Sequence, residues 1–473
     1  MRKTLRELPV TLDDTYFRIL QSVDKNYESQ IREILTLIAL SKRPLRLGEI
    51  LEFIAFNTET KSFDEEKRFI EPLDILDICS SLVIFVNQSS EDSGHDTGDA
   101  GNGVDKEDDG DEDFKVLRKE LQFAHYSVKE FLISERTSTN PFHISESYAH
   151  TLIAERCVRY LLSHLAVSME LTRKSLEMFP FLEYAGVEWY NHAYAASLAA
   201  DSEELNTLII KFFDSSSHCC FHNWLKIWDP DKEQKSDPAE HQLYYPQPLY
   251  YSSLLGLFRA TNDLVTKGVD VSLQGGYFGN ALQAASHCGY EAIVQLLLAN
   301  GADVNMQGGY FGNALQAASE GGHQATVQVL LENGADVNAH GGLLGTALLA
   351  ASSRCHEATV LLLLAKGADI NAMGSVFNPL AYASFFGDEA MVRLLLDKGA
   401  DVYNDGGGYR SAIGAAREGG LTLRHDHESI VQLLSDYRIN EINRAWDPET
   451  ASLEVHCGDN CCCDCEVGFE ETT

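Results

Sequence analysis

The sequence has few basic residues for its length. Its 473 residues include 37 Lys and Arg against 71 Asp and Glu, which gives a formal net charge of −34. Affinity for duplex nucleic acid depends largely on Lys and Arg that neutralise phosphates, so this balance argues against a nucleic-acid partner. Over half of the negative excess lies in segments 87–113 and 447–473, so the argument is weaker for the rest of the chain.

Long apolar runs are also missing. The longest candidate, residues 34–40, is far shorter than the about 18 to 20 residues of a bilayer-spanning helix. The N-terminal sequence MRKTLRELPV lacks the apolar core of a secretory signal. We therefore expect a soluble, cytoplasmic protein with no membrane partner, in which the 11 cysteines are reduced thiols.

The motifs of common nucleotide-binding and hydrolytic enzymes are absent. A P-loop needs Gly-x-x-x-x-Gly-Lys-Ser/Thr to hold phosphates, and neither Gly-Lys-Ser nor Gly-Lys-Thr occurs in the sequence. The Gly-x-Ser-x-Gly elbow and the His-Glu-x-x-His pair are missing too. We therefore expect a protein that is not an enzyme and that uses no cofactor.

The strongest positive signal is an internal repeat of 33 residues. Gly-Ala-Asp or a near copy begins at Gly268, Gly301, Gly334, Gly367 and Gly399, at spacings of 33, 33, 33 and 32. A second marker, an apolar residue, keeps the same phase. It stands at Leu249, Leu282, Leu315, Leu348, Leu380 and Ile413. Two markers in phase identify a true repeat.

Each repeat predicts two short helices and a projecting hairpin. In one repeat, Asn280 is a suitable N-cap for a helix of small residues that ends at Gly289. The next run, EAIVQLLLANGAD, predicts a helix that is apolar on more than one face and ends at Gly301. Such a repeat buries its apolar faces only when neighbours stack on it.

These repeats resemble ankyrin repeats over residues 247–437, in about six copies. The family's Thr-Pro-Leu-His opening appears here as Asn280-Ala281-Leu282-Gln283, which leaves open whether the hydrogen bonds of the missing His are kept. Cys355 stands where other repeats have a turn Gly, and residues 421–426 form an insert in the last repeat. We expect irregular helix ends at both places.

The N-terminal third predicts helices over residues 30–39, 47–55 and from Pro72, then two strands and a further helix. The strands are expected over residues 82–86 and 121–125, and the last helix over residues 128–134. Three helices and two strands indicate a winged-helix arrangement. The loop between the strands, residues 87–113, has eleven acidic residues and one Lys, so we expect it to be disordered, with a docking site for a basic partner as the alternative.

Several strings here are similar to the segment that follows the nucleotide-binding domain in fungal NACHT and ankyrin proteins of the NLR-like class. They are LPVTLDDTYFRIL, SKRPLRLGEI, EPLDILDICSSLVIF and FAHYSVKEFLIS, and FPFLEYAGVEWYNHA resembles the helical bridge of that class. The resemblance implies a signalling or non-self-recognition role in a fungus. It also implies that His125 senses bound nucleotide. The favoured alternative, given the missing P-loop, is a His hydrogen-bonded at a strand-to-helix turn.

The hairpin tips supply the candidate partner-binding residues, because apolar pairs recur there in register. The candidates are Tyr277, Phe278, Tyr310, Phe311, Leu343, Leu344, Phe377 and Tyr409. Stacked repeats would align them in an edge, and exposed aromatic rows are enriched in binding hot spots. The alternative is that the tips only pack against one another and against the helices.

Two Cys and His groups are candidate metal ligands. The first has the soft thiolates that suit Zn or Cu(I) but lacks paired Cys-x-x-Cys spacing, so a tail with free thiols is the alternative. It consists of Cys457, Cys461, Cys463 and Cys465. The second group is weaker and consists of His218, Cys219, Cys220 and His222.

The sequence thus predicts a mainly α protein with five parts. They are a linker helix (1–27), a winged-helix-like module (28–136), a helical bridge (137–246), an ankyrin-repeat solenoid (247–440) and a disordered, acidic, Cys-rich tail (441–473). The predicted function is a scaffold or receptor that binds a partner protein through its repeats.

Two alternatives from other classes remain. One is a fragment of a signal-transducing NTPase whose P-loop domain is missing from this chain. The other is a winged-helix DNA-binding regulator, against which the acidic third helix, EPLDILDICSS, argues locally.

Overall fold

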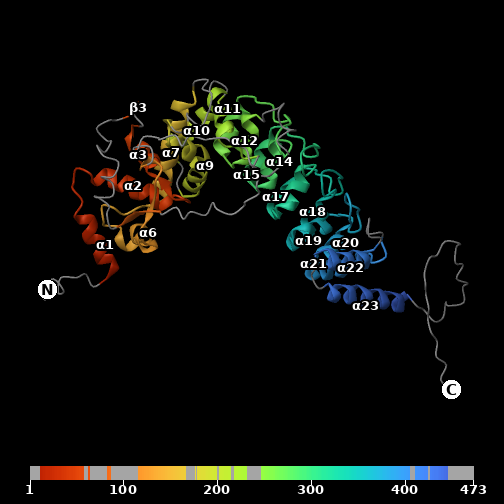
Figure 1. Cartoon of the computed structure of the whole chain (residues 1–473). Helices are drawn as coiled ribbons and strands as arrows, with labels where there is room; N and C mark the ends of the chain where they lie inside the picture. The colour runs from red at the N-terminus through yellow and green to blue at the C-terminus, as the bar shows by residue number, and fades with distance from the viewer. Residues whose placement is uncertain are drawn as a thin grey trace, which may run out of the picture. The chain divides into compact units, whose positions relative to one another are not determined.

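Helices dominate both parts of the chain, and the strands are few and short (Figure 1). The computed structural model describes residues 11–57, 62–63, 82–86, 116–166, 176, 178–199, 202–214, 218–231, 247–404, 411–423 and 427–445. The chain forms a first unit, Met1–Ala335, and a second unit, Asp336–Thr473. Among the described helices, none combines the length and the apolar character that crossing a bilayer requires.

The first unit begins with a small antiparallel sheet among helices. The elements are α1 (Leu12–Gln21), α2 (Glu28–Leu40), β1 (Leu45–Arg46), α3 (Leu47–Ala55), β2 (Phe56–Asn57), β3 (Ser62–Phe63), β4 (Val83–Phe85), β5 (Glu120–Phe123), α6 (Tyr126–Ile133) and the 3-10 helix η3 (Glu135–Thr137). The predicted strand pair is confirmed, with Val83 opposite Phe123. Sequence reasoning missed β1, a two-residue strand that pairs with the other edge of β5. The predicted third helix and acidic loop lie outside the described residues.

Buried charges join this region to the next helix, α7 (Glu146–His164). The Arg156 guanidinium donates to both carboxylate oxygens of Glu33 on α2, at 3.0 and 2.8 Å, and to the Phe53 carbonyl on α3 at 3.0 Å. Its positive charge also lies over the Phe53 ring, 4.6 Å from the centroid. Because removal of the half-buried Glu33 would leave the buried Arg156 charge without its ion partner, this cluster fixes the three helices in one arrangement.

The bridge region packs α7 with α9 (Phe181–Ala199), α10 (Glu203–Phe213) and α11 (His218–Ile227). Its core is a cluster of fully buried aromatic rings in edge-to-face and tilted pairs. The members are Trp189, Phe212, Phe213, Phe221, Trp224 and Tyr251. Aromatic side chains bury large areas and prefer these geometries, so the cluster is a strong anchor between the bridge and the helix that carries Tyr251.

A chain of hydrogen bonds runs through the α7–α9 contact. Ser41 Oγ and Tyr184 Oη lie 3.0 Å apart, Tyr184 Oη lies 3.0 Å from His192 Nε2, and the Nδ1 atoms of His192 and His150 are 2.9 Å apart. Burial, together with the neighbouring His150 and Lys42, lowers the pKa of His192 to about 3. Two facing ring nitrogens need one donor and one acceptor, so at least one of the two imidazoles is neutral, and the lowered pKa of His192 makes it the neutral one.

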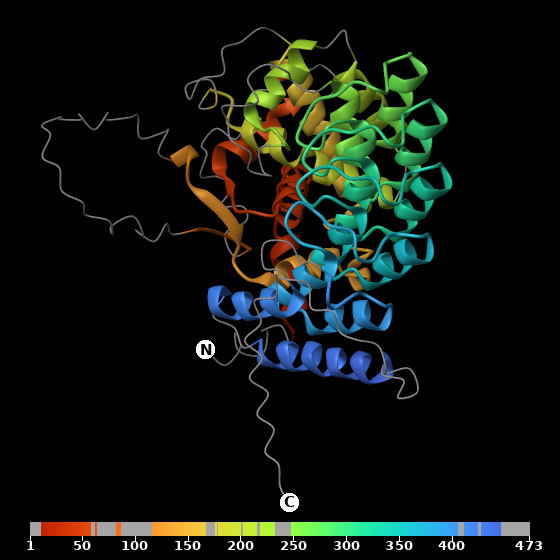
Figure 2. The ribbon, with the colours of Figure 1, turned by 90° about the vertical axis from the view of Figure 1, so that its right-hand side faces the viewer.

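Paired helices of the repeats follow in the first unit. They are α12 (Pro248–Leu254), α13 (Phe258–Thr266), α14 (Ala281–His287), α15 (Glu291–Ala299), α16 (Ala314–Glu320) and α17 (Gln324–Glu332). Figure 2 shows these pairs, in green, lying one upon the next. The predicted caps are confirmed, since Asn280 Oδ1 accepts from the Gln283 amide at 2.9 Å. All seven residues of α16 are buried, as expected of a helix enclosed by neighbours.

Gln283 makes the hydrogen bonds between neighbouring repeats that the missing His put in question. Its Nε2 donates to the carbonyls of Met306, Gly308 and Gly312 in the next repeat, at 3.1, 3.2 and 3.0 Å. A side-chain amide with two donor hydrogens thus does here what the family's His does. A second set of hydrogen bonds joins the loops of successive repeats, because Asn305 Nδ2 donates to the Gly334 carbonyl at 3.0 Å.

The second unit repeats the helix pairs. They are α18 (Ala347–Ser353), α19 (Glu357–Ala365), α20 (Pro379–Phe386), α21 (Glu389–Asp397), α22 (Ala412–Leu423) and α23 (Glu428–Ala445). Asn338 bridges two repeats, donating to the Gly367 carbonyl at 3.1 Å and accepting from the Asp369 amide at 2.8 Å. The expectation of an irregular helix end at the insert is wrong for its first three residues, 421–423, which continue α22 as regular helix.

Cys355 keeps the left-handed turn of the glycines it replaces. With a φ of 59°, Cys355 is the one residue other than glycine that has a positive φ among the described residues. Its thiol donates to Asp388 Oδ2 at 2.7 Å, and this bond, with partial burial, raises the pKa of Cys355 to about 11. At the matching position of the first unit, a Cβ on Gly289 would lie 2.4 Å from His323. Cys355 is therefore tolerated because a smaller Asp faces it.

We expect Cys355→Gly to raise the free energy of unfolding of the second unit, by up to about 1 kcal/mol, because it removes left-handed strain. The matched change Gly289→Ala should instead destabilise the first unit by about 1 to 2 kcal/mol or more, because it introduces both strain and a clash with His323. Urea denaturation followed by far-UV circular dichroism measures both. Destabilisation by Cys355→Gly would show that the Asp388 bond outweighs the strain.

The bridge should lose stability in acid. The folded-state pKa of His192 lies below its unfolded value of about 6.5, so the unfolded chain binds more protons as the pH falls through this window. Between about pH 8 and pH 5 the loss from His192 is about 2 kcal/mol. His192→Gln should flatten this slope, whereas Tyr184→Phe should keep it. Urea denaturation at several pH values, read from the buried Trp189 and Trp224, tests this, and an unchanged slope in His192→Gln contradicts it.

Candidate functional site

The hairpins between helix pairs are narrow and rich in glycine. In the first unit they close through single bridges between Gln274 and Asn280 and between Gly308 and Gly312. Gly309 has a φ of 63°, and a Cβ there would lie 2.1 Å from the Phe278 carbonyl oxygen of the preceding hairpin. Glycine is therefore required for neighbouring tips to approach this closely.

The two members of each tip pair have opposite environments. Phe278 and Phe311 are buried, at 1% and 7% exposure, whereas Tyr310 is 39% exposed and Tyr277 is half-buried. The Tyr277 and Tyr310 rings stack with centroids 4.8 Å apart, and the Tyr310 amide donates to the Tyr277 carbonyl at 2.9 Å. The Phe rings therefore pack inward, as the packing alternative supposed, and the Tyr rings form an outer edge, whose role in binding a partner stays a prediction.

A second stack supports this edge from beneath. The His287 ring packs against both Phe278 and Phe311, with centroid distances of 4.6 and 5.0 Å, and the two Phe rings stack 6.0 Å apart. His287 Nδ1 also lies 3.3 Å from a carboxylate oxygen of the buried Glu320. The edge therefore rests on packed rings and is held in one conformation.

The end of the bridge anchors the first tip. Asp231 accepts from the Tyr250 hydroxyl at 2.7 Å through Oδ1 and from the Tyr277 amide at 3.0 Å through Oδ2. The Phe278 amide in turn donates to Tyr250 Oη at 3.2 Å. The carboxylate of Asp231 thus takes the place that a preceding hairpin would occupy. Sequence reasoning missed Asp231, because no local pattern marks an aspartate whose partners lie 19 and 46 residues away.

The second unit shows the same division between outer and inner tip residues. Leu343 and Val376 are 55% and 53% exposed, whereas Leu344 and Phe377 are half-buried. The Phe377 ring packs against Phe385, with centroids 5.4 Å apart. Tyr409, also a predicted binding residue, lies outside the described residues.

His125 lies at a strand-to-helix turn, as the favoured alternative for it supposed. It is the N-cap of α6, and its Nδ1 accepts from the Ser127 amide at 3.2 Å. The turn borders a cavity of about 490 Å³. The charged residues lining it are Lys42, Arg43 and Lys129, with no Asp or Glu among the described lining residues.

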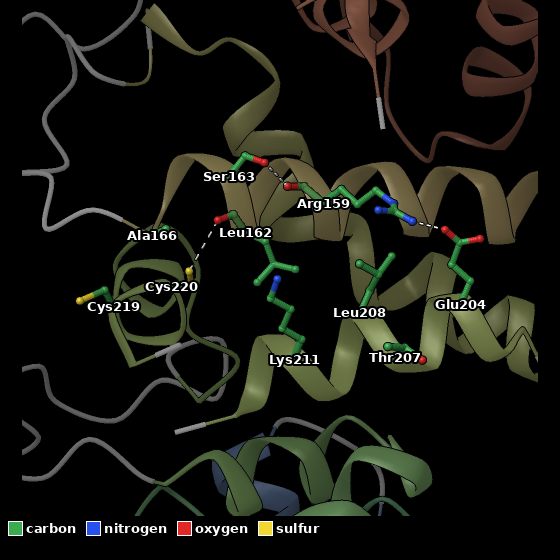
Figure 3. A pocket seen from close by; sticks show the side chains of 10 residues that line it. All are labelled: Arg159, Leu162, Ser163, Ala166, Glu204, Thr207, Leu208, Lys211, Cys219 and Cys220. Carbon is green, nitrogen blue, oxygen red and sulfur yellow. Dashed lines mark hydrogen bonds and ion pairs between the residues drawn. The ribbon is translucent and has the colours of Figure 1, made fainter. Parts of the chain in front are cut away.

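A larger cavity of about 610 Å³ lies among α7, α10 and α11 (Figure 3). It is lined by Arg159, Leu162, Ser163, Ala166, Glu204, Thr207, Leu208, Lys211, Cys219 and Cys220. Two members of the weaker Cys and His group therefore border a cavity. In that group Cys219 is exposed, whereas Cys220 is buried with its sulfur 3.9 Å from the Leu162 carbonyl oxygen.

Neither metal-site prediction has support among the residues that the structure describes. Cys457, Cys461, Cys463 and Cys465 lie outside them. Within the described residues, no three His, Cys, Asp or Glu side chains gather in a way that could hold a metal ion.

The family model "Ankyrin repeats (3 copies)" matches residues 249–341 and 340–405. The chain carries ankyrin repeats. It is also 35% identical over 308 residues to a Monascus ruber protein named "Azaphilone pigments biosynthesis cluster protein L". That match covers 62% of this chain and 60% of the relative, so the chain spans less than two thirds of the relative's length. Among solved structures, the human ASB11 ankyrin repeat domain matches 40% of this chain and 83% of its own, at 29% identity and a TM-score of 0.35.

The inner and outer residues of the ankyrin hairpins should respond differently to truncation. Phe278→Ala should destabilise the first unit by about 3 kcal/mol or more, because it opens a cavity beneath the edge. Tyr310→Ser should cost about 1 kcal/mol or less, because Tyr310 is 39% exposed against 1% for Phe278 and its ring loses mainly one stacking contact. Urea denaturation measures both variants, and equal losses would contradict the division between inner and outer residues.

Proposed function

We propose that the chain is a non-enzymatic protein-binding scaffold or receptor, and that in its first unit the stacked Tyr277–Tyr310 edge contacts the partner. The observation that carries this proposal is the pair of outward tyrosine rings, held by buried phenylalanines beneath them. Ankyrin repeats suggest protein binding in general, and the edge names a surface for it.

The energetics favour such an edge as a binding surface. Association costs free energy for every side chain that becomes ordered at the interface. Tyr277 and Tyr310 are already ordered by their stacking and by the backbone bond between them, so little of that cost remains. Tyrosine is also enriched among the residues that contribute most to binding, because it combines a large apolar ring with a hydroxyl.

The chemistry of the hairpins indicates the kind of partner surface. Residues 271–280 and 304–313 contain no Asp, Glu, Lys or Arg. The edge therefore offers rings, hydroxyls and backbone groups, which suits an apolar or aromatic surface with polar backbone groups and no strong charge. This property differs from the acidic character of the chain as a whole.

The biological setting of this binding is NLR-like signalling in a fungus. The support is the similarity of FAHYSVKEFLIS and its companion strings to the NACHT and ankyrin class. A relative that bears the name of a pigment biosynthesis cluster is compatible with a regulatory or recognition role beside such a cluster.

The test compares partner capture by full-length variants. Tyr277→Ser with Tyr310→Ser should remove the partner proteins that the wild-type chain captures from an extract of its source organism, as quantified by mass spectrometry. The melting temperature should fall by only a few degrees, because the buried rings remain.

A matched control is Tyr148→Ser on α7, which removes a tyrosine that is exposed but lies outside the repeats. This variant should keep every captured protein. Loss of the same partners in the control, or their retention in the double variant, would exclude the tyrosine edge as the binding surface.

A second candidate function is that of the C-terminal portion of a signal-transducing NTPase. The observation favouring it is the cavity beside His125, where Lys42 and Lys129 suit phosphate groups, whereas the third basic lining residue, Arg43, pairs with Glu49. The genomic sequence upstream of this chain decides the question: an in-frame Gly-Lys-Thr or Gly-Lys-Ser after a strand supports it, and a closed reading frame opposes it.

A further inference from the structure

The cavity among α7, α10 and α11 has the size of a ligand site. Its volume of about 610 Å³ lies within the roughly 300 to 1,000 Å³ of small-molecule pockets. Three helices line it, so its shape depends on how α7 packs against α10 and α11. Figure 3 shows Leu162, Leu208 and Lys211 directed toward one space, with the Cys220 sulfur at its edge and the Cys219 sulfur pointing away from it.

Among the described residues that line the cavity, Lys211 is the charged residue for which no described ion-pair partner is found. Arg159 on α7 pairs with Glu204 on α10, and the two charges offset each other. Lys211 extends from α10 toward Leu162 in Figure 3, and no described residue bonds to its Nζ. Burial raises the pKa of the neighbouring Cys220 thiol, although the positive charge of Lys211 acts to lower it. The thiol therefore stays neutral, and Lys211 is left to attract an anion.

The remaining walls are apolar, with two hydroxyls. Leu162, Ala166 and Leu208 supply the apolar surface. Ser163 Oγ donates to the Arg159 carbonyl at 2.9 Å, and Thr207 Oγ1 donates to the Glu203 carbonyl at 2.8 Å. Because each hydroxyl hydrogen is used, both oxygens are left as acceptors.

We infer that this cavity binds a small amphipathic organic acid, with its carboxylate on Lys211 and its apolar body against Leu162, Ala166 and Leu208. One cation selects a monoanion over a polyanion, and the apolar walls select a carbon chain or ring over a sugar. The acceptor oxygens of Ser163 and Thr207 suit a ligand that also carries a hydroxyl.

The position of the site connects its occupancy to the ankyrin repeats of the first unit. Helix α10 contacts α13, where Arg259 pairs with Glu203 at 3.0 Å. Just after α10, Asp214 pairs with Lys267 at 2.6 Å. A ligand between α7 and α10 therefore stabilises the helix on which the first repeat rests.

The experiment uses decanoate as the probe and decan-1-ol as its neutral counterpart, with the full-length chain. Isothermal titration calorimetry should show saturable binding of decanoate, tighter than that of decan-1-ol. Lys211→Met should weaken decanoate binding about fivefold and leave decan-1-ol binding unchanged, because an exposed ion pair contributes about 1 kcal/mol. Lys226→Met on α11, a lysine outside the cavity, is the matched control and should bind as wild type does.

Thiol reactivity gives a second readout that locates the site. Saturating decanoate should slow alkylation of Cys220, whose sulfur lies at the edge of the cavity, by iodoacetamide several-fold, as measured by peptide mapping, while the exposed Cys219, whose sulfur points away from the cavity, serves as reference. The inference is overturned if Lys211→Met binds decanoate like wild type, if Lys226→Met weakens binding equally, or if no saturable binding occurs up to about 1 mM.

Discussion

Enclosure of the short, small-residue helix of each repeat by its neighbours is the constraint on which the described repeats depend, whereas α15, predicted to be apolar on more than one face, buries only Ile293, Val294 and Leu297. In α14 six of seven residues are buried, and in α16 all seven are, so neither helix is stable without neighbours on both sides. Within the first unit the stack therefore needs a surface against which its first helix pair can pack. The bridge provides it, because Tyr251 of α12 joins Phe221 and Trp224 of α11 in one aromatic cluster.

The same stacking decides the chemistry of the hairpin edge. Neighbouring tips approach closely because glycine lies where a Cβ would meet the preceding backbone, as at Gly309. Once the backbones are this close, only one ring of each pair has room beneath, and the other is held at the surface. An exposed but ordered aromatic edge is thus a consequence of packing below it, and order before binding is what lowers the cost of association.

The bridge has a different physical character from the repeats. It is held by buried polar groups, including Arg156 with Glu33 and the line from Ser41 through Tyr184 to His192. Such groups make the packing of α7 against α2, α3 and α9 specific, at the cost of sensitivity to protonation. The cavity beside Lys211 lies in this region, among α7, α10 and α11.

The sequence by itself determined the repeat, its helix pairs, its caps and the strand pair of the N-terminal region, because these depend on local patterns of apolar residues, Asn and Gly. Only the tertiary structure decided three features. It showed that Gln283 keeps the bonds between repeats, that Phe278 and Tyr277 have opposite environments, and that Asp231 and Lys211 occupy their sites. Each depends on atoms from segments far apart in the chain. A periodic pattern identifies which residues face a neighbour but not what that neighbour places opposite them.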